Sequence, residues 1–389
     1  MGDKPLGKCD EPSVDIQPAP SPTTPASPSP RLVSLDVLRG FDMFWILGAS
    51  VIGAALAGAS KAPWALFIAA QLDHAGWAGF QFLDLIFPLF IFISGVSLVY
   101  STDKSVSTIG KQATVLRLLR RAILLYILGL LCHVGLADGI AGVRWLGVLQ
   151  RLAICGFFAG LCYLFLKQRA YLALTIFLLL GYWALLTFIP VPGVGAGNFA
   201  EGQNLTNWID SQYLAGFKYD GPHDPEGLLS TLPAIATCLI GVATGSWLKH
   251  QPGSVWRKSL QLAAAGVILA ALGWAWHPYF PVIKKLWTSS FVLVAGGYSL
   301  LLLAAFLALI DGWKLHRPFA PFLWIGMNPI TLYLSQYFVN YDKLSRILLG
   351  GPFAEAFGPW SGVVLASGNV LLSIWLAWFL FSRKIFLRV

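Results

Sequence analysis

Residues 71–90, QLDHAGWAGFQFLDLIFPLF, place His74 just ahead of a run that is apolar enough to enter a membrane, and they put Asp84 inside that run. Burying a carboxylate in hydrocarbon is costly, so an acidic residue in such a run is a candidate for function. A histidine at the boundary with water is the side chain best suited to exchanging protons near neutral pH. The stretch therefore predicts a membrane-embedded helix with a polar site at its edge.

The composition is that of a membrane protein. Hydrophobic residues make up 57% of the chain and charged residues only 12%, whereas roughly 25% of a soluble domain is charged. Apolar runs of about 20 residues, which can cross some 30 Å of hydrocarbon as a helix, recur along nearly the whole chain. The runs are continuously apolar instead of alternating, which favours helices over a β-barrel. We therefore predict an all-α, polytopic membrane helical bundle of about ten transmembrane helices. The predicted helices occupy approximately 34–58, 79–101, 113–136, 145–167, 171–190, 228–248, 258–276, 288–310, 319–338 and 361–381.

The chain is expected to contain one folded domain. Residues 1–30 include PAPSPTTPASPSP and are too rich in Pro and Ser to bury a core, so they are predicted to form a disordered tail. Residues 31–389 then form a single transmembrane domain. Most of the 27 Lys and Arg residues fall in alternate loops and at the two ends of the chain. By the positive-inside rule both termini are cytoplasmic, and the net charge of +9 reflects this topology instead of a nucleic-acid partner.

The cysteines indicate no metal site. They show neither metal-ligand spacing nor a disulfide framework, and most of them fall in predicted helices, where they are expected to be small packed thiols. The five are Cys9, Cys132, Cys155, Cys162 and Cys238.

Topology places several polar residues within roughly a turn or two of the external membrane face. These residues are His74, Asp84, Gln150, Arg151, Asp224 and Glu226. Simpler explanations stay open for them. His74 can be a solvated or capping residue, Asp84 and Arg151 can form a structural ion pair, and Asp224 can be the N-cap of a helix that continues through Pro225. The long external loop 191–227 is of a length that often forms a lid or a binding segment.

A second polar group is expected at the cytoplasmic face. Asp36, Arg39 and Asp42 follow one another at spacing three, so Asp36 and Arg39 can pair on one helix face. An arginine held at a cytoplasmic mouth also suits a phosphate-bearing donor. The other candidates for this contact lie in the run RLLRR: Arg117, Arg120 and Arg121. The alternative for this run is a topology signal.

Five motifs, taken in order, resemble the membrane family of heparan-alpha-glucosaminide N-acetyltransferase and its bacterial relatives. They are RLVSLDVLRGFDMFW (31–45), DHAGWAGFQFLDLIFPLFIFISG (73–95), GVLQRLAI (147–154), DPEGLLSTLPAIATCLIGVATG (224–245) and GMNPITLY (326–333). The resemblance runs from about residue 31 to the C-terminus. It implies a transmembrane acetyltransferase that moves acetyl from cytosolic acetyl-CoA to the amine of a glucosamine-type sugar on the extracytoplasmic side, with His74 as the catalytic residue.

The acceptor site departs from the family pattern at one position. Ser50 stands where the animal enzyme has an active-site asparagine, and a hydroxyl cannot reproduce the hydrogen bonds of an amide. In the ninth predicted helix, Asn328 precedes a helix-breaking proline that frees backbone groups near a site. The expected substrate-binding residues are Ser50, Asp73, Gln150, Asp224, Glu226 and Asn328.

The expected chemistry is acyl transfer to an amine. A sugar ammonium must lose a proton before its nitrogen attacks a thioester, and His74 is the expected general base, with Asp73 or Asp84 orienting its ring. Arg151 or Gln150 is expected to stabilise the tetrahedral intermediate. An acetyl-histidine intermediate is the other route.

Two other functions stay open. A proton-coupled sugar or small-molecule transporter would also place ionisable groups and a broken helix around a site, and an acyltransferase could act on another external glycan. The expected partners are acetyl-CoA as co-substrate, an amino sugar and the lipid bilayer, with no nucleic acid and no metal, and the chain could form a homodimer. Short external loops favour a bacterial inner membrane over a lysosomal membrane.

Overall fold

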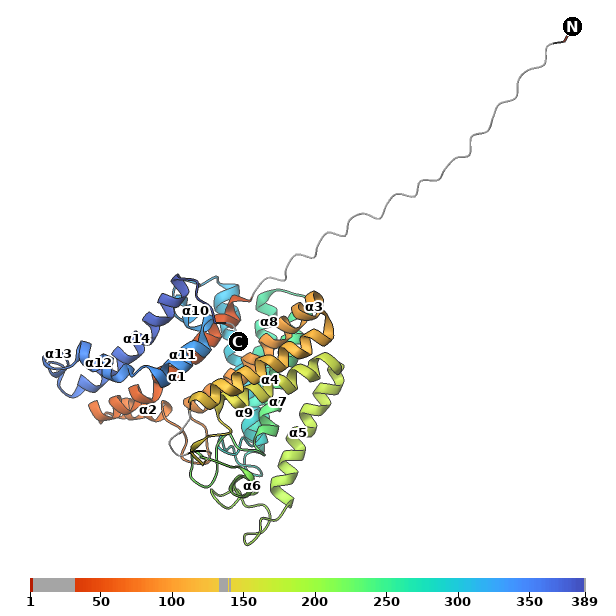
Figure 1. Cartoon of the computed structure of the whole chain (residues 1–389). Helices are drawn as coiled ribbons and strands as arrows, with labels where there is room; N and C mark the ends of the chain where they lie inside the picture. Colours follow the sequence, from red (N-terminus) through yellow and green to blue (C-terminus); the bar gives the residue numbers. More distant parts are fainter. Residues whose placement is uncertain (3–31, 133–138, 140, 388–389) are drawn as a thin grey trace. The chain divides into compact units, whose positions relative to one another are not determined.

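The computed structural model describes residues 1–2, 32–132, 139 and 141–387. Contacts divide the chain into two units, Met1–Arg31 and Leu32–Val389, and every helix that is described belongs to the second unit (Figure 1). The predicted disordered tail, apart from residues 1–2, lies outside the described residues, as does the end of the predicted helix 113–136.

The described part of the second unit is built from helices and contains no strand. Short 3-10 and π elements carry the label η. The elements are α1 (Val33–Ala59), α2 (Pro63–Gln71), η1 (Phe82–Leu85), α3 (Ile86–Cys132), α4 (Val148–Phe165), α5 (Gln168–Phe188), α6 (Leu205–Tyr213), α7 (Thr231–His250), α8 (Val255–Trp276), α9 (Ser289–Phe306), η3 (Leu307–Gly312), α10 (Ala320–Met327), α11 (Pro329–Phe338), α12 (Tyr341–Leu349), α13 (Pro352–Glu355), η4 (Gly358–Trp360) and α14 (Ser361–Ser382).

These helices confirm the prediction of a polytopic helical membrane protein. In the described ranges, 7 helices are long and apolar enough to cross a membrane, and α1, which bends by 53° between Gly48 and Ser50, would make the number up to 8. The count of about ten and the cytoplasmic position of both termini stay predictions.

Two features account for the lower count. The predicted helices 79–101 and 113–136 both fall in α3, whose 47 residues would extend about 70 Å as one straight helix. Gly110 interrupts α3 with φ 80° and ψ 172°, a conformation that glycine adopts because it has no Cβ. The predicted helix 319–338 is divided into α10 and α11, since Pro329 cannot donate the backbone hydrogen bond that would continue α10.

Glycines let the helices that carry polar residues approach closely. A Cβ added at Gly95 of α3 would collide with the carbonyl of Cys238 on α7, and one added at Gly40 of α1 would collide with the carbonyl of Phe322 on α10. Close approach through small residues is typical of helix packing in membranes. Because Gly40 follows Arg39 directly, the contact between α1 and α10 also fixes where that arginine lies.

The connections that follow α2, α5 and α8 are tied together at one end of the helices. Gly79 donates its N–H to the carbonyl of Val282 (2.9 Å), and Trp77 Nε1 donates to the carbonyl of Phe199 (2.9 Å). Figure 1 shows these connections beside α6, next to the ends of α5, α7 and α9. Residues that are more than a hundred positions apart in sequence therefore meet here.

Candidate active site

His74 and Asp84 are in direct contact. His74 lies in the connection between α2 and η1, and its Nδ1 is 2.8 Å from Oδ1 of Asp84. Asp84 is fully buried, and its Oδ2 accepts the backbone N–H groups of Ala75 (3.1 Å) and Gln81 (3.0 Å). Of the two expected partners for the ring, Asp84 makes the contact, while Asp73 Oδ1 accepts the backbone N–H of His74 (2.8 Å). The imidazole itself is half exposed, at 51% of its side-chain surface, so a substrate can reach it.

Lys284, which the sequence analysis did not select, completes this group. Its Nζ lies 2.9 Å from Nδ1 and 3.1 Å from Nε2 of His74, and 3.5 Å from Oδ1 of Asp84. Burial lowers the pKa of Lys284, although the charges of Asp84 and Glu226 oppose that shift. A signal was available, because two consecutive lysines in a predicted external loop run against the positive-inside rule.

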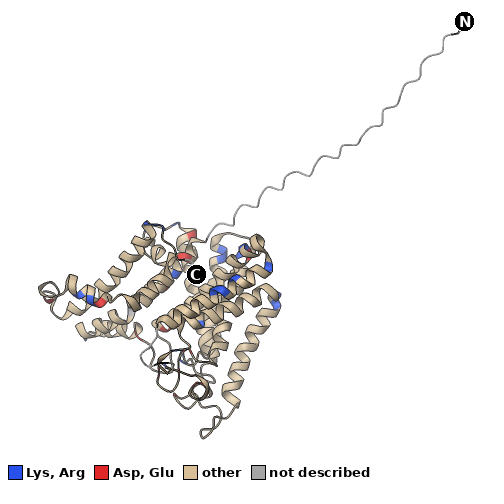
Figure 2. Ribbon diagram, viewed as in Figure 1, with Lys and Arg blue, Asp and Glu red and all other residues tan. Residues whose placement is uncertain are grey.

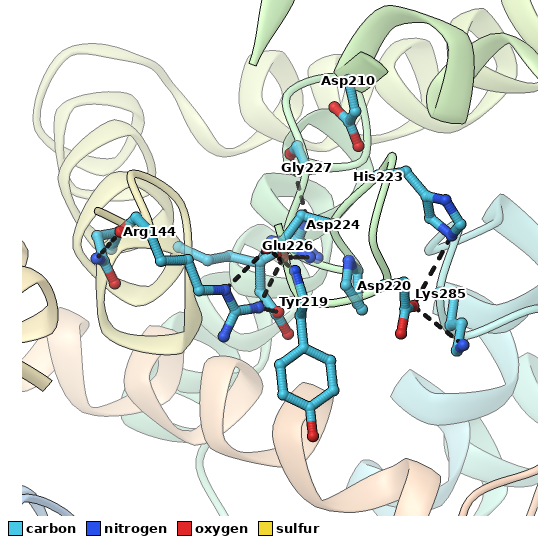
Figure 3. Close-up of polar contacts among 12 residues, drawn as sticks. Arg144, Asp210, Tyr219, Asp220, His223, Asp224, Glu226, Gly227 and Lys285 are labelled. Atoms are coloured by element: carbon cyan, nitrogen blue, oxygen red, sulfur yellow. Dashed lines mark hydrogen bonds and ion pairs between the residues drawn. The ribbon is translucent and has the colours of Figure 1, made fainter. Parts of the chain in front are cut away.

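A second buried group forms around Arg144, another residue that the sequence analysis missed (Figure 3). Arg144 is 4% exposed and donates from Nε and Nη2 to both oxygens of Asp224 (2.8 and 2.6 Å), and from Nη2 to Glu226 Oε2 (2.6 Å). Such a two-point contact between an arginine and a carboxylate is among the stronger hydrogen-bonding arrangements in proteins. Gln150 supports the group by donating from Nε2 to the carbonyl of Arg144 (3.2 Å).

Burial and neighbouring charges shift the pKa values of this group in different directions. Burial raises the pKa of Glu226 despite the nearby Arg151 and Arg144. Burial also acts to raise the pKa of Asp224, but the hydrogen bonds and charge of Arg144 outweigh it and lower that pKa. For Arg144 burial acts to lower the pKa, and its two carboxylate partners raise it instead. One carboxylate is therefore held firmly as an anion, and the other can take up a proton more readily than usual.

The alternative in which Asp224 begins a helix is wrong. Helix α7 starts at Thr231 with Ser230 as its N-cap, and Asp224 lies in the turn before it. Asp224 Oδ1 does accept the backbone N–H of Glu226 (2.9 Å), but residues 225–230 form turns and do not continue as a helix.

The alternative ion pair between Asp84 and Arg151 is also absent from the described residues. Arg151 is fully buried, and its Nη2 donates to the carbonyl of Gly227 (3.3 Å) and to the hydroxyl of Ser230. Its guanidinium lies 4.9 Å from the ring centroid of Trp287. Within the part of the chain that is described, Arg151 Nε and Nη1 are buried and have no hydrogen-bond partner.

Two expected substrate-binding residues make no hydrogen bond to His74 among the described residues. Ser50 is exposed on α1. Asn328 is buried at the break between α10 and α11, where its Nδ2 donates to the carbonyl of Ile385 (2.9 Å) and its Oδ1 accepts the N–H of Leu387 (3.2 Å). The amide of Asn328 thus holds the C-terminal segment against the helix break.

All four arginines expected to contact the donor line one cavity of about 530 Å³. Besides Arg39, Arg117, Arg120 and Arg121, its wall carries the hydroxyls of Ser94, Ser97, Ser101, Thr102, Ser105 and Thr114. We call it the arginine cavity. Arg39 is fixed in the wall because it donates to Ser97 Oγ (2.7 Å) and pairs with Asp36 (3.2 Å), as the spacing predicted.

Asp42 is buried, and neither of its oxygens has a hydrogen-bond partner among the described residues. Figure 2 shows basic residues gathered on the parts of α3 and α8 that lie farthest from α6.

A third charged cluster has the composition of a metal site but already contains a cation. Potential ligand atoms of Glu201, Asp220 and His223 lie within 4.8 Å of one another. Lys285 Nζ pairs with Glu201 Oε1 (3.2 Å) and Asp220 Oδ2 (3.0 Å), as Figure 3 shows for Asp220. Burial lowers the pKa of His223, with Asp220 and Glu201 opposing the shift. The single positive charge of the ammonium offsets one of the two carboxylate charges, and the absence of a metal cofactor stays a prediction.

Sequence comparison supports the resemblance drawn from the motifs. The chain is 27% identical to heparan-alpha-glucosaminide N-acetyltransferase of Homo sapiens over 92% of its own length, and 26% identical to the enzyme of that name from Mus musculus over 87%. The chain spans 60% and 58% of the length of these two relatives. No protein-family model matches the chain.

Proposed function

We propose that the chain is a membrane-bound acetyltransferase that moves the acetyl group of acetyl-CoA to the amine of a glucosamine-type sugar. The similarity to two proteins named heparan-alpha-glucosaminide N-acetyltransferase supports this activity. The observation that carries the proposal is the arginine cavity, because it collects four guanidinium groups and a row of hydroxyls in one space of about 530 Å³.

The arginine cavity suits the donor. Guanidinium groups bind phosphates through paired hydrogen bonds, and acetyl-CoA carries phosphates at its nucleotide end. The hydroxyls of Ser94, Ser97, Ser101 and Ser105 follow one another at spacings of three and four along α3, so they share one helix face. We infer that this face pairs with the amides of the pantetheine arm, while the phosphates remain with the arginines.

His74 suits the acceptor chemistry. In the proposed step the sugar nitrogen attacks the acetyl carbonyl carbon, the bond between carbon and sulfur breaks, and coenzyme A leaves as its thiolate. The proton lost by the sugar nitrogen passes to a ring nitrogen of His74, whose imidazole is half exposed. Arg151 Nε and Nη1, which are buried and have no hydrogen-bond partner among the described residues, are the donors that we assign to the developing oxyanion. An acetyl-histidine formed first on Nε2 uses the same residues and stays the second route.

The proposed transfer crosses the membrane. The basic residues of the arginine cavity, which α3 lines on both sides of the break at Gly110, mark the cytoplasmic side under the positive-inside rule. His74 precedes the N-terminal end of α3 at Ile86. Leu124, Leu152 and Ile330 line the cavity together with the arginines, so the thioester arm would pass between α3, α4 and α11. We propose an integral membrane location, with the bacterial inner membrane favoured.

The proposal is tested with the purified full-length protein, acetyl-CoA and glucosamine, with the product identified by mass spectrometry. N-acetylglucosamine is expected from the unaltered protein, and His74→Ala should lower the rate by at least a hundredfold without changing the amount of folded protein. His277→Ala is the matched control, since that histidine contacts Val282 and Trp274 and not Asp84. Near-normal transfer by His74→Ala, or uptake of labelled sugar into vesicles without acetyl-CoA, would contradict the proposal.

A further inference from the structure

Lys284 is held beside His74 by a rigid connection between α8 and α9. The backbone on its N-terminal side bonds to Gly79 through the carbonyl of Val282 (2.9 Å). On its C-terminal side, Trp287 is fully buried, has φ 53° and donates from Nε1 to Thr237 Oγ1 (3.1 Å). A bulky residue with positive φ persists only where its surroundings enforce it. The position of the Lys284 ammonium therefore follows from the fold.

We propose that Lys284 is a positioning residue for the acyl-transfer step, whose ammonium keeps the imidazole of His74 uncharged so that it can accept a proton from the sugar amine. This inference rests on the proposed function for its role in turnover. The geometry behind it does not, because the contact of 2.9 to 3.1 Å between Lys284 Nζ and both ring nitrogens exists without a substrate.

The charges that face His74 explain why such a residue is needed. Asp84 touches Nδ1 from η1, and Asp73 binds the backbone N–H of His74. Both carboxylates favour a second proton on the ring, which would remove the lone pair that the proposed mechanism uses. Lys284 is the cation that faces the same ring, and Glu226 acts on it electrostatically from the connection before α7. Even at the dielectric constant of bulk water, an ammonium about 3 Å from the ring changes a protonation equilibrium about tenfold.

The neighbouring lysine has a different task. Lys285 pairs with Glu201 and Asp220 (3.2 and 3.0 Å), and its ring contact is with Trp77 at 5.9 Å. Burial acts to lower the pKa of Lys285, but its two carboxylate partners raise it, whereas burial lowers the pKa of Lys284. Two adjacent residues of the same type therefore serve separate carboxylate groups, which makes Lys285 a matched control.

The test compares the unaltered full-length protein with Lys284→Met, Lys284→Arg and Lys285→Met. The rate constant kcat/KM is measured against pH with acetyl-CoA and glucosamine. Lys284→Met should move the acidic limb of this profile upward by about one pH unit while the rate at high pH stays within about threefold. Lys284→Arg should restore the original limb, and Lys285→Met should leave it in place. An unmoved limb in Lys284→Met, or an equal shift in Lys285→Met, would overturn the inference.

A second readout separates this inference from the proposed function. Diethyl pyrocarbonate modifies uncharged imidazole, so the pH dependence of His74 modification, followed on its own peptide by mass spectrometry, needs no substrate. The same upward shift of about one pH unit is expected in Lys284→Met. If the unaltered protein transfers no acetyl group but this shift appears, the proposed function is wrong and the effect of Lys284 on His74 is confirmed. If modification of His74 follows the same pH curve in both proteins, the inference fails. Lys284→Gln replaces Lys284→Met if the latter does not fold.

Discussion

Replacing Arg144 by Met should destabilise the protein strongly. Arg144 is 4% exposed and makes three hydrogen bonds of 2.6 to 2.8 Å to Asp224 and Glu226. Its removal leaves two buried carboxylates without their cation, and breaking a buried ion pair from one side costs about 3–5 kcal/mol. Methionine has a similar length and no charge, so the change isolates the loss of the guanidinium from the loss of packing volume.

The free energy of unfolding can be measured by SDS titration in mixed micelles, with helix content followed by circular dichroism. The matched control is Arg346→Met on α12, which removes an exposed contact of 2.8 Å with Asp342. That pair is open to solvent, so its loss should be hard to detect. The double variant Arg144→Met with Glu226→Gln should regain part of the lost stability, since one buried charge is then removed. A loss in Arg144→Met no larger than that in Arg346→Met would refute the reasoning.

Two further predictions concern other parts of the structure. Burial raises the pKa of Asp210 to about 6, so the folded state holds this proton more tightly than the unfolded state does. The stability from this group is present at low pH and is lost as pH rises from about 4 to 6. Asp210→Asn should remove this loss of stability, which is about 3 kcal/mol in the free energy of unfolding. If the free energy of unfolding changes with pH in the same way in both proteins between pH 4 and pH 8, the prediction is wrong. Arg117→Ala should raise the KM for acetyl-CoA about 10- to 100-fold, because it removes a charged hydrogen bond, with kcat little changed. Arg169→Ala on α5, exposed and outside the arginine cavity, is the control, and an equal rise in both variants would count against the cavity as the donor site.

The helices, and the charge pairs between residues close in sequence, could be predicted from the sequence. Long apolar runs predicted α1, α4, α5, α7, α8, α9 and α14, because hydrocarbon demands about 20 apolar residues with all backbone groups satisfied. The pair of Asp36 and Arg39 followed from spacing along one helix. The helix break at Pro329 followed from the missing N–H of proline. Gly110 falls between the predicted helices 79–101 and 113–136, and the interruption of α3 lies at this glycine.

The contacts between distant connections could not be predicted. Arg144 and Asp224 are separated by 80 positions, and Lys284 and His74 by 210. No helical periodicity relates such residues, and a lysine in a loop resembles a solvated surface charge until the fold places it. From the sequence, an ion pair between Asp84 and Arg151 stayed open beside a contact of Asp84 with His74. The described residues show the contact with His74, and they add Lys284, which was not predicted. Depth in the membrane predicted which residues share a level, and only the packing of the connections determined which of them touch.

The central claim is that the donor binds at the arginine cavity on one side of the membrane and that transfer occurs at His74 on the other. Sealed vesicles of known orientation test it directly, with acetyl-CoA supplied to one compartment and glucosamine to the other. The account predicts N-acetylglucosamine only when acetyl-CoA is on the side of the arginine cavity and the sugar is on the side of His74. Product that forms only when both substrates share one compartment would contradict it.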